Sequence, residues 1–292
     1  MTDAPPTIES ESEPEPGSAS PPDGQPIVRL LGVHKRFARH RVLRGITLGF
    51  PTGRTTVVLG PSGCGKSVML KHIIGLLQPD KGQVWFENTR LDTLRESQLV
   101  AIRRQIGFLF QHGALFDSYT VGENVAFPLA EHTDMSRDQR LDKAAEMLGL
   151  VGLRDHMQKM PADLSGGQRK RAALARAIVL HPRVILYDEP TTGLDPIRAD
   201  VINELIIRLR EELDATSIVV THDLTSAFKV AERMVMLHEG RVVKEGSPAA
   251  FRESPNPVVQ RFLRGEATAD ELGDVQTLIP IANPADNADA RT

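Results

Sequence analysis

The residues of this chain that are best suited to chemistry begin with a glycine-rich stretch ending in lysine and serine. It reads Gly60, Pro61, Ser62, Gly63, Cys64, Gly65, Lys66, Ser67, a complete match to the phosphate-binding P-loop pattern GxxxxGK[ST]. Glycines let backbone N–H groups approach a phosphate closely, and the start of a helix adds a favourable dipole. The lysine of such a loop reaches the β- and γ-phosphates, and the serine hydroxyl coordinates Mg²⁺. We expect this stretch and the next residue, Val68, to bind a nucleotide, with no separate chemistry for Cys64.

A second stretch, Leu164-Ser165-Gly166-Gly167-Gln168, lies where an amphipathic helix over residues 167–180 is predicted to begin. The first turn of a helix leaves backbone N–H groups without partners in the helix, and the helix dipole is positive there. Ser165, Gly166 and Gly167 therefore form a second segment suited to contact a phosphate.

Two carboxylates follow the apolar run at residues 184–187. At the end of a buried strand, Asp188 can hold Mg²⁺ or its water shell, and Glu189 is our candidate for the general base that polarises an attacking water. Gln111 and His222 also follow predicted strands, at residues 106–110 and 217–220. A carboxylate pair or a histidine after a strand is by itself a weak signal, so these assignments depend on the surrounding pattern.

The elements around these residues alternate between strand and helix. Residues 55–59 are an apolar, β-branched run that leads directly into the P-loop, and residues 66–77 are predicted to be helical. This strand–loop–helix context is what a true P-loop requires. Further strands are predicted at 27–33, 42–50, 83–87, 106–110, 184–187, 217–220 and 234–237, and further helices at 95–104, 137–150 and 167–180. Alternation of this kind favours a parallel sheet.

Together, the P-loop, the LSGGQ stretch at 164–168 and the Asp188-Glu189 pair resemble the motifs of the nucleotide-binding subunits of ABC transporters. The resemblance covers residues 27–265, which we expect to form one ABC ATPase domain. It implies an α/β fold, the P-loop NTPase fold of the ABC type. Its mainly parallel β core carries an antiparallel β subdomain and an α-helical subdomain at about residues 112–180. It also implies ATP and Mg²⁺ as cofactors and ATP hydrolysis as the activity.

The resemblance also assigns roles to single residues. Gln111 corresponds to the glutamine that senses Mg²⁺ and the attacking water, and His222 to the histidine that touches the γ-phosphate. Phe37, which lies 23 residues before Gly60, has the position of an aromatic residue that stacks on adenine. The catalytic set is then Glu189, His222 and Gln111, and the metal ligands are Ser67, Gln111 and Asp188.

A head-to-tail dimer is a further implication of the resemblance. In the family, the signature residues of one copy close over the ATP that is held by the P-loop of a second copy, and the D-loop contacts that copy. In this chain the signature residues are Ser165, Gly166, Gly167 and Gln168, and the D-loop includes Asp195. A second copy of the chain is therefore expected to complete each ATP site.

A finer resemblance lies in residues 110–116 (FQHGALF), 120–129 (TVGENVAFPL), 131–133 (EHT) and 258–265 (VVQRFLRG). These segments are similar to the ATPases of Mla/Mce-type systems, which move phospholipids or related lipids between the membranes of diderm bacteria. The resemblance implies integral-membrane permease subunits as partners, with MCE-domain and small STAS-type accessory subunits. It also implies a peripheral position on the cytoplasmic face of the inner membrane. We expect residues 111–129 to receive the permease.

Two other functions are kept as alternatives. Gln168 gives the generic signature, whereas we associate Met or another residue with this position in the Mla/Mce group, so an importer of amino acids or other small solutes stays open. A soluble ABC protein that acts on ribosomes or DNA is the third candidate. Such proteins usually carry two ATPase cassettes or a long coiled coil, and this chain has one cassette and no heptad run.

Composition and charge limit the classes of protein to which the chain can belong. The 292 residues include a single cysteine, so no intramolecular disulfide is possible, and no apolar run has the roughly 20 residues that span a bilayer. The N-terminus lacks the pattern of a secretory signal. Residues 1–26 carry six acidic groups and no Lys or Arg, and we expect a disordered tail there.

The C-terminal extension at 266–292 carries a net charge of −5. Since the whole chain carries −3, the body at 27–265 is left with about +8, a balance that fits phosphate ligands. No basic stripe is interleaved with aromatic residues, so no nucleic-acid partner is expected. Within the extension, Leu278, Ile279 and Ile281 are candidates to dock on a neighbouring ATPase or an accessory subunit.

Overall fold

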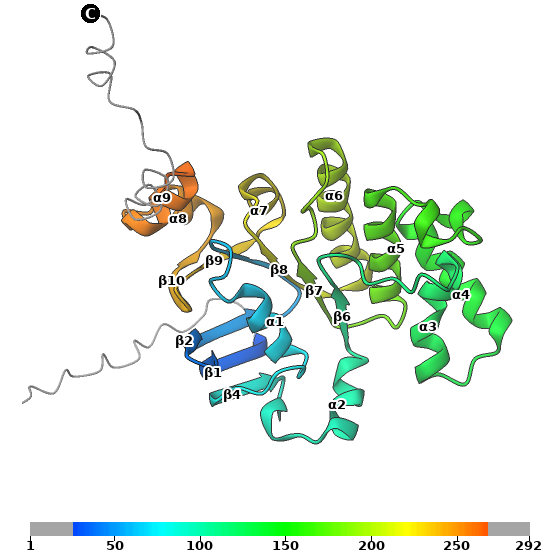
Figure 1. Ribbon diagram of the computed structural model, residues 1–292, viewed down its shortest axis with the longest axis horizontal. Helices are drawn as coiled ribbons and strands as arrows, with labels where there is room; N and C mark the ends of the chain where they lie inside the picture. The colour runs from blue at the N-terminus through cyan, green and yellow to red at the C-terminus, as the bar shows by residue number, and fades with distance from the viewer. Residues whose placement is uncertain (1–25, 268–292) are drawn as a thin grey trace, which may run out of the picture.

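The computed structural model describes residues 26–267, which form two β-sheets and a set of helices that cover them (Figure 1). The acidic tail expected at 1–26 and the extension at 266–292, with its apolar segment, lie outside the described residues apart from their innermost positions. The strands are β1 (Pro26–Phe37), β2 (His40–Pro51), β3 (Thr55–Leu59), β4 (Lys81–Phe86), β5 (Thr89–Arg90), β6 (Ile106–Leu109), β7 (Val184–Asp188), β8 (Thr216–Thr221), β9 (Arg233–His238) and β10 (Arg241–Gly246). The α-helices are α1 (Lys66–Ile73), α2 (Glu96–Arg103), α3 (Val121–His132), α4 (Arg137–Leu150), α5 (Gly166–Ile178), α6 (Pro196–Leu213), α7 (Leu224–Val230), α8 (Pro248–Arg252) and α9 (Pro257–Arg264).

A six-stranded sheet in the order β10-β9-β3-β8-β7-β6 forms the centre of the molecule. Its strands are parallel except for the antiparallel pair β9–β10. Every residue of β3, β7 and β8 is buried, because both faces of this sheet are covered. The expected parallel core is confirmed, and its register aligns the carboxyl ends of β3, β7 and β8, as in the pair Leu59↔Thr221.

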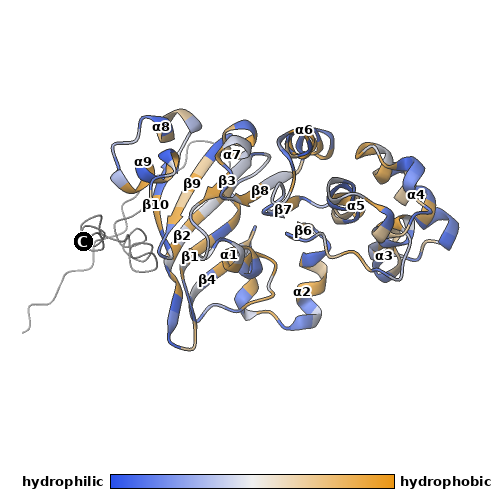
Figure 2. Cartoon of the chain, turned by 45° about the horizontal axis from the view of Figure 1, so that its top comes forward, coloured by the Kyte–Doolittle hydropathy of each residue, from blue (hydrophilic) through white to orange (hydrophobic). Residues whose placement is uncertain are grey.

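The antiparallel subdomain is a four-stranded sheet in the order β2-β1-β4-β5. Its inward residues, such as Phe50 and Phe86, share one buried cluster with Val58, Leu186 and Ile218 of the central sheet. The opposite face of the central sheet packs against helices in a second cluster. In Figure 2, hydrophobic residues follow the strands of both sheets, whereas α4 carries long hydrophilic stretches.

Helices α3, α4 and α5 form the helical subdomain, to the right of the sheets in Figure 1. Each begins with a capping box, in which an N-cap hydroxyl accepts a hydrogen bond from the backbone three residues later. The N-cap residues are Thr120, Ser136 and Ser165. The sequence predicted α4 with its observed bounds and α5 within two residues.

Some elements differ from the sequence-based expectation. The helix predicted over 66–77 ends at Ile73, because Gly75 has a φ of 71° and Leu99 lies directly beside it. Strands β5 and β10 and helices α3, α6, α7, α8 and α9 were not individually predicted. Within residues 26–267, no helix combines the length and apolar character that a bilayer crossing requires.

Candidate active site

The P-loop connects the end of β3 to the start of α1, and two of its three glycines have no room for side chains. A Cβ atom on Gly60 would lie 2.2 Å from the carbonyl oxygen of Leu237, and one on Gly65 would lie 2.7 Å from a methyl carbon of Leu43. Gly60 and Gly65 also have positive φ angles of 152° and 107°. The loop can therefore follow this path only with glycine at both positions.

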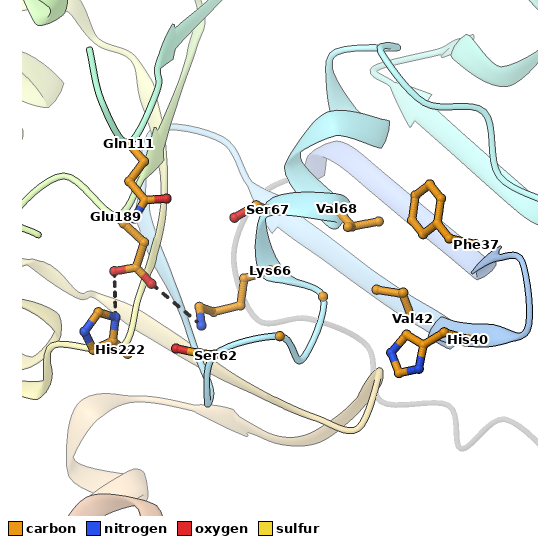
Figure 3. Close-up of a pocket in the computed structure, with 12 residues that line it drawn as sticks. Phe37, His40, Val42, Ser62, Lys66, Ser67, Val68, Gln111, Glu189 and His222 are labelled. Atoms are coloured by element: carbon orange, nitrogen blue, oxygen red, sulfur yellow. Dashed lines mark ion pairs between the residues drawn. The ribbon is translucent and has the colours of Figure 1, made fainter. Parts of the chain in front are cut away.

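A cavity of about 500 Å³ lies directly against the P-loop (Figure 3). It brings together residues from distant parts of the sequence, and all of the following line it: Phe37, His40, Val42, Ser62, Gly63, Gly65, Lys66, Ser67, Val68, Gln111, Glu189 and His222. Residues predicted for the P-loop, for adenine stacking and for hydrolysis thus meet in one place, at the carboxyl ends of the central strands. His40 and Val42, which follow Phe37 on the β1–β2 hairpin, were not predicted.

Lys66 is almost fully buried and curls over the loop that it belongs to. Its ammonium group donates hydrogen bonds to the carbonyl oxygens of Gly60 at 2.7 Å and Pro61 at 3.1 Å. It also lies 3.7 Å from Oε1 of Glu189. A cation held among carbonyls and one carboxylate at the bottom of an open cavity is suited to meet a polyphosphate.

The Ser67 hydroxyl donates a 2.7 Å hydrogen bond to Oδ1 of Asp188. Burial raises the pKa of Asp188, and the hydrogen bond from Ser67 opposes part of that rise. Gln111 adds an amide oxygen to the same cavity. Hydroxyl, carboxylate and amide oxygens are the ligands that Mg²⁺ accepts, so these three residues fit the ion that the fold implies.

Glu189 is held by an unusually dense set of contacts. Its φ of 50° lies in the left-handed region, which is uncommon for a residue other than glycine. One carboxylate oxygen, Oε2, accepts hydrogen bonds from the hydroxyls of Thr192 and Thr221, both at 3.2 Å, and lies 3.0 Å from Nδ1 of His222. The side chain therefore has a fixed direction toward the phosphate cavity.

Lys170 is a residue of this site that the sequence analysis missed. It lies on α5, five residues after Ser165, and donates a 3.1 Å hydrogen bond to the backbone carbonyl of Glu189. Its side chain is 7% exposed, and burial lowers its pKa to about 8, against the opposing field of the Glu189 carboxylate. The sequence could have indicated only that Lys170 is buried, since it falls in the buried stripe of α5 with Gly167 and Leu174. The contact fixes the backbone at the left-handed residue.

The signature residues do not lie in the phosphate cavity. Ser165, Gly167 and Gln168 line a separate, small hollow at the start of α5, beside the first turns of α6. Asp195, at the start of α6, caps that helix by accepting a hydrogen bond from the backbone of Arg198. One of the two segments predicted to contact phosphate therefore lies outside the cavity of its own chain.

Comparison with known proteins gives consistent results. A family profile described as ABC transporter matches residues 43–192. The probable ribonucleotide transport ATP-binding protein mkl of Mycobacterium leprae is 43% identical over 238 residues, which make up 82% of this chain and 69% of that protein. The intermembrane phospholipid transport system ATP-binding protein MlaF of Escherichia coli is 39% identical over 226 residues, 77% of this chain and 84% of that protein.

A solved structure is also similar. It is the dimeric ATP-binding cassette MJ0796 in a post-hydrolysis state, bound to ADP and Pi. It matches this chain with a TM-score of 0.70 and 36% identity, over 75% of this chain and 98% of that one.

Replacing Lys170 tests whether its amine is as strongly desolvated as the structure indicates. Between the folded-state pKa of about 8 and the ordinary value of 10.5, the unfolded chain binds more protons than the folded chain. The wild type should therefore gain about 2 kcal/mol of stability between pH 7 and pH 9.5 relative to Lys170→Met, which has no titrating group there. Urea unfolding at both pH values measures this difference. Lys159→Met removes an exposed lysine as the control, and an equal pH dependence in all three proteins would contradict the assignment.

Proposed function

This chain belongs to the ABC transporter family as an ATP-binding subunit that hydrolyses ATP, and from that premise we propose that it drives the transport of phospholipids or related lipids between bacterial membranes. The observation that carries the lipid assignment is the 39% identity to MlaF along 84% of that protein, whose name describes intermembrane phospholipid transport. The segments at 110–133 and 258–265 support the same group. The name of mkl gives ribonucleotides instead, so the proposed cargo needs a direct test.

We propose that the cavity residues divide the hydrolytic work as the sequence suggested. The phosphates lie on the P-loop at the start of α1, where Lys66 exchanges its carbonyl contacts for phosphate oxygens. Phe37, which is 44% exposed at the end of β1, offers a free ring face to adenine. Glu189 acts as the general base, and its contact with His222 keeps the carboxylate directed at the attacking water.

Mg²⁺ is the proposed metal cofactor, with Ser67, Asp188 and Gln111 as the residues that hold it or its water shell. The ion would supply positive charge beside the β- and γ-phosphates. Asp188 suits this part because, within residues 26–267, its buried carboxylate accepts a side-chain hydrogen bond from Ser67 alone and keeps lone pairs for the ion or its water shell.

We propose that two copies of the chain form the active unit. Because the signature residues lie outside the cavity of their own copy, they are free to complete the site of the other. Helix α5 begins at Gly166, beside the hollow, and the N–H groups of its first turn make this helix end suited to an anion. The dimeric state of MJ0796 supports this arrangement by analogy.

The proposed permease contact is an aromatic surface directly after Gln111. Phe116 and Tyr119 are 42% and 39% exposed, and their rings cluster with Phe127 at centroid distances of 4.8 to 6.2 Å. They adjoin a groove of about 430 Å³ that is bounded by α2, β6, α3 and α5. An exposed aromatic cluster beside a groove is typical of a protein interface.

Two substitutions separate nucleotide binding from hydrolysis. Lys66→Ala removes the charged phosphate contact and should weaken ATP binding. Glu189→Gln keeps the shape but loses the base, so turnover should fall roughly 10²-fold or more while ATP still binds. Nucleotide titration and phosphate release measure the two effects. With ATP, Glu189→Gln should also elute as a dimer, and normal turnover in this variant would remove Glu189 as the base.

Cross-linking identifies the partner of the aromatic surface. A photoreactive group on Phe116→Cys should capture an integral-membrane subunit when the chain is isolated with its native membranes. The native Cys64 is 7% exposed, so the unsubstituted chain serves as the background control. Met135→Cys, on the loop before α4, is an equally exposed position that should capture much less. Capture of only a second copy of this chain from Phe116 would overturn the permease assignment.

The cargo is tested with the native complex, isolated through a tag on this chain and reconstituted in proteoliposomes. ATP-dependent transfer of a fluorescent phospholipid to acceptor vesicles is expected, and the Glu189→Gln complex should not perform it. Amino acids and ribonucleotides are supplied in parallel as competing cargoes. If one of these is moved and the phospholipid is not, the lipid assignment is wrong even though the ATPase assignment stands.

A further inference from the structure

We propose that a basic cleft on the outer side of the β1–β2 hairpin binds a phosphate-bearing anion and thereby adjusts the nucleotide cavity on the hairpin's other side. The cleft has a volume of about 500 Å³ and shares no lining residue with the nucleotide cavity. Six cationic side chains line it: Lys35, Arg36, Arg41, Arg44, Lys81 and Arg241. Its effect on ATP rests on the proposed stacking of adenine on Phe37, whereas the binding itself does not.

The cleft holds far more positive than negative charge. Asp80 is the one carboxylate among its lining residues, and it is already paired with Lys35 at 3.1 Å. The backbone N–H of Arg36 and the side chain of Lys35 lower the pKa of Asp80, so this residue is ionised. Among residues 26–267, the side chains of Arg36, Arg41, Lys81 and Arg241 have no hydrogen bond or ion pair.

The β-sheet register forces these charges together. Arg36 on β1 and Arg41 on β2 are direct cross-strand partners, and like charges in that position repel. His34 lies opposite Arg44 on one side and Lys81 on the other. The body at 27–265 carries a net charge of about +8, and six of its cationic side chains gather in this one cleft. A bound anion would remove the repulsion.

Arg44 provides a second, independent observation. Its Nε is buried and has no hydrogen-bond partner. Only its Nη1 lies near a carboxylate within residues 26–267, at 3.8 Å from Oε2 of the exposed Glu239. A donor of this kind is usually satisfied in folded proteins. Because Arg44 lines the cleft, an acceptor bound there is a natural partner for it.

Phosphate is the anion that fits these donors best. Guanidinium groups present paired N–H donors that match two oxygens of a phosphate, and four of the six cations are arginines. The volume of the cleft lies within the usual range for ligand pockets and suits a ligand with several phosphates or a lipid headgroup. Both sources share this chemistry, and the experiment below distinguishes them.

The hairpin connects the cleft to the nucleotide cavity. Arg36 and Arg41 line the cleft, while the residues that follow each of them, Phe37 and Val42, line the nucleotide cavity. Lys35 bridges the two sides, since its ammonium lies 5.7 Å from the centre of the Phe37 ring. An anion that draws the cations together would fix the end of the hairpin, and with it the ring proposed to stack on adenine.

The first measurement is binding to the full chain with the P-loop filled by a saturating non-hydrolysable ATP analogue and Mg²⁺. Calorimetry with tripolyphosphate tests the soluble source. Sedimentation with phosphatidylcholine vesicles, with and without 30% phosphatidylglycerol, tests the lipid source. At least one probe should bind to the wild type, and Arg36→Gln combined with Arg41→Gln should weaken that binding at least tenfold. Arg208→Gln combined with Arg261→Gln removes the same charge from α6 and α9 and should bind as the wild type does.

The second measurement is the KM for ATP in the presence of the probe that binds. If the probe also competes with ATP at the P-loop, it does so in all variants. A KM that differs only in the cleft variant therefore measures the effect of the cleft, transmitted through the hairpin. We expect the probe to change the KM for ATP at least threefold in the wild type and in the α6/α9 control. The KM of the cleft variant should stay the same with and without the probe. Absence of binding by both probes, or equal binding by the cleft variant, would overturn the site. Equal KM values would overturn its link to the nucleotide.

Discussion

Close backbone packing at two glycines joins the separate parts of this molecule around one phosphate-binding loop. Gly60 lies against the carbonyl of Leu237 on β9, and Gly65 lies against Leu43 on β2, so the loop is enclosed by both sheets at once. The direction of α1, the placement of Lys66 and the distance to the hairpin all follow from this enclosure. A side chain at either glycine would separate the sheets that the buried clusters hold together.

The second organising feature is the way in which adjacent buried acids are neutralised. Asp188 and Glu189 are 6% and 8% exposed, and two neighbouring carboxylates at that depth need compensation. Each has different partners: the Ser67 hydroxyl donates to Asp188, and two threonine hydroxyls donate to Glu189, whose carboxylate also lies beside Nδ1 of His222. Lys66 supplies the nearest full positive charge. The same contacts that make these buried acids tolerable also give them separate directions, as the separate tasks proposed for them require.

Much of the fold could be predicted because its signals are local. The run at 55–59 and the helix at 137–150 were predicted with their observed bounds, since apolar runs and amphipathic patterns are read directly from the sequence. Helix α3 was harder to predict because Pro128 lies inside it. Strand β10 has no fully buried residue, so it lacks the apolar run by which β9, its neighbour, was found.

Residues of the site were predictable where a motif names them and not where only packing does. The cavity contains Lys66, Gln111, Glu189 and His222 as expected. Lys170 was identified only from its hydrogen bond to Glu189, which connects α5 to the end of β7. Spacing along the chain carries no information about such a contact between elements. The location of the signature residues relative to the P-loop likewise depends on tertiary structure.

The single thiol of the chain has a consequence for chemical resistance. Cys64 lies inside the P-loop, where its sulfur contacts the space that a side chain at Gly60 would need. Burial raises the pKa of this thiol, and Lys66 offsets only part of that effect, so little of the reactive thiolate forms near neutral pH. Alkylating agents and peroxides act on the thiolate. We therefore expect the nucleotide site to escape oxidation to the sulfenic acid, and the protein to keep its phosphate loop chemically intact under electrophilic stress.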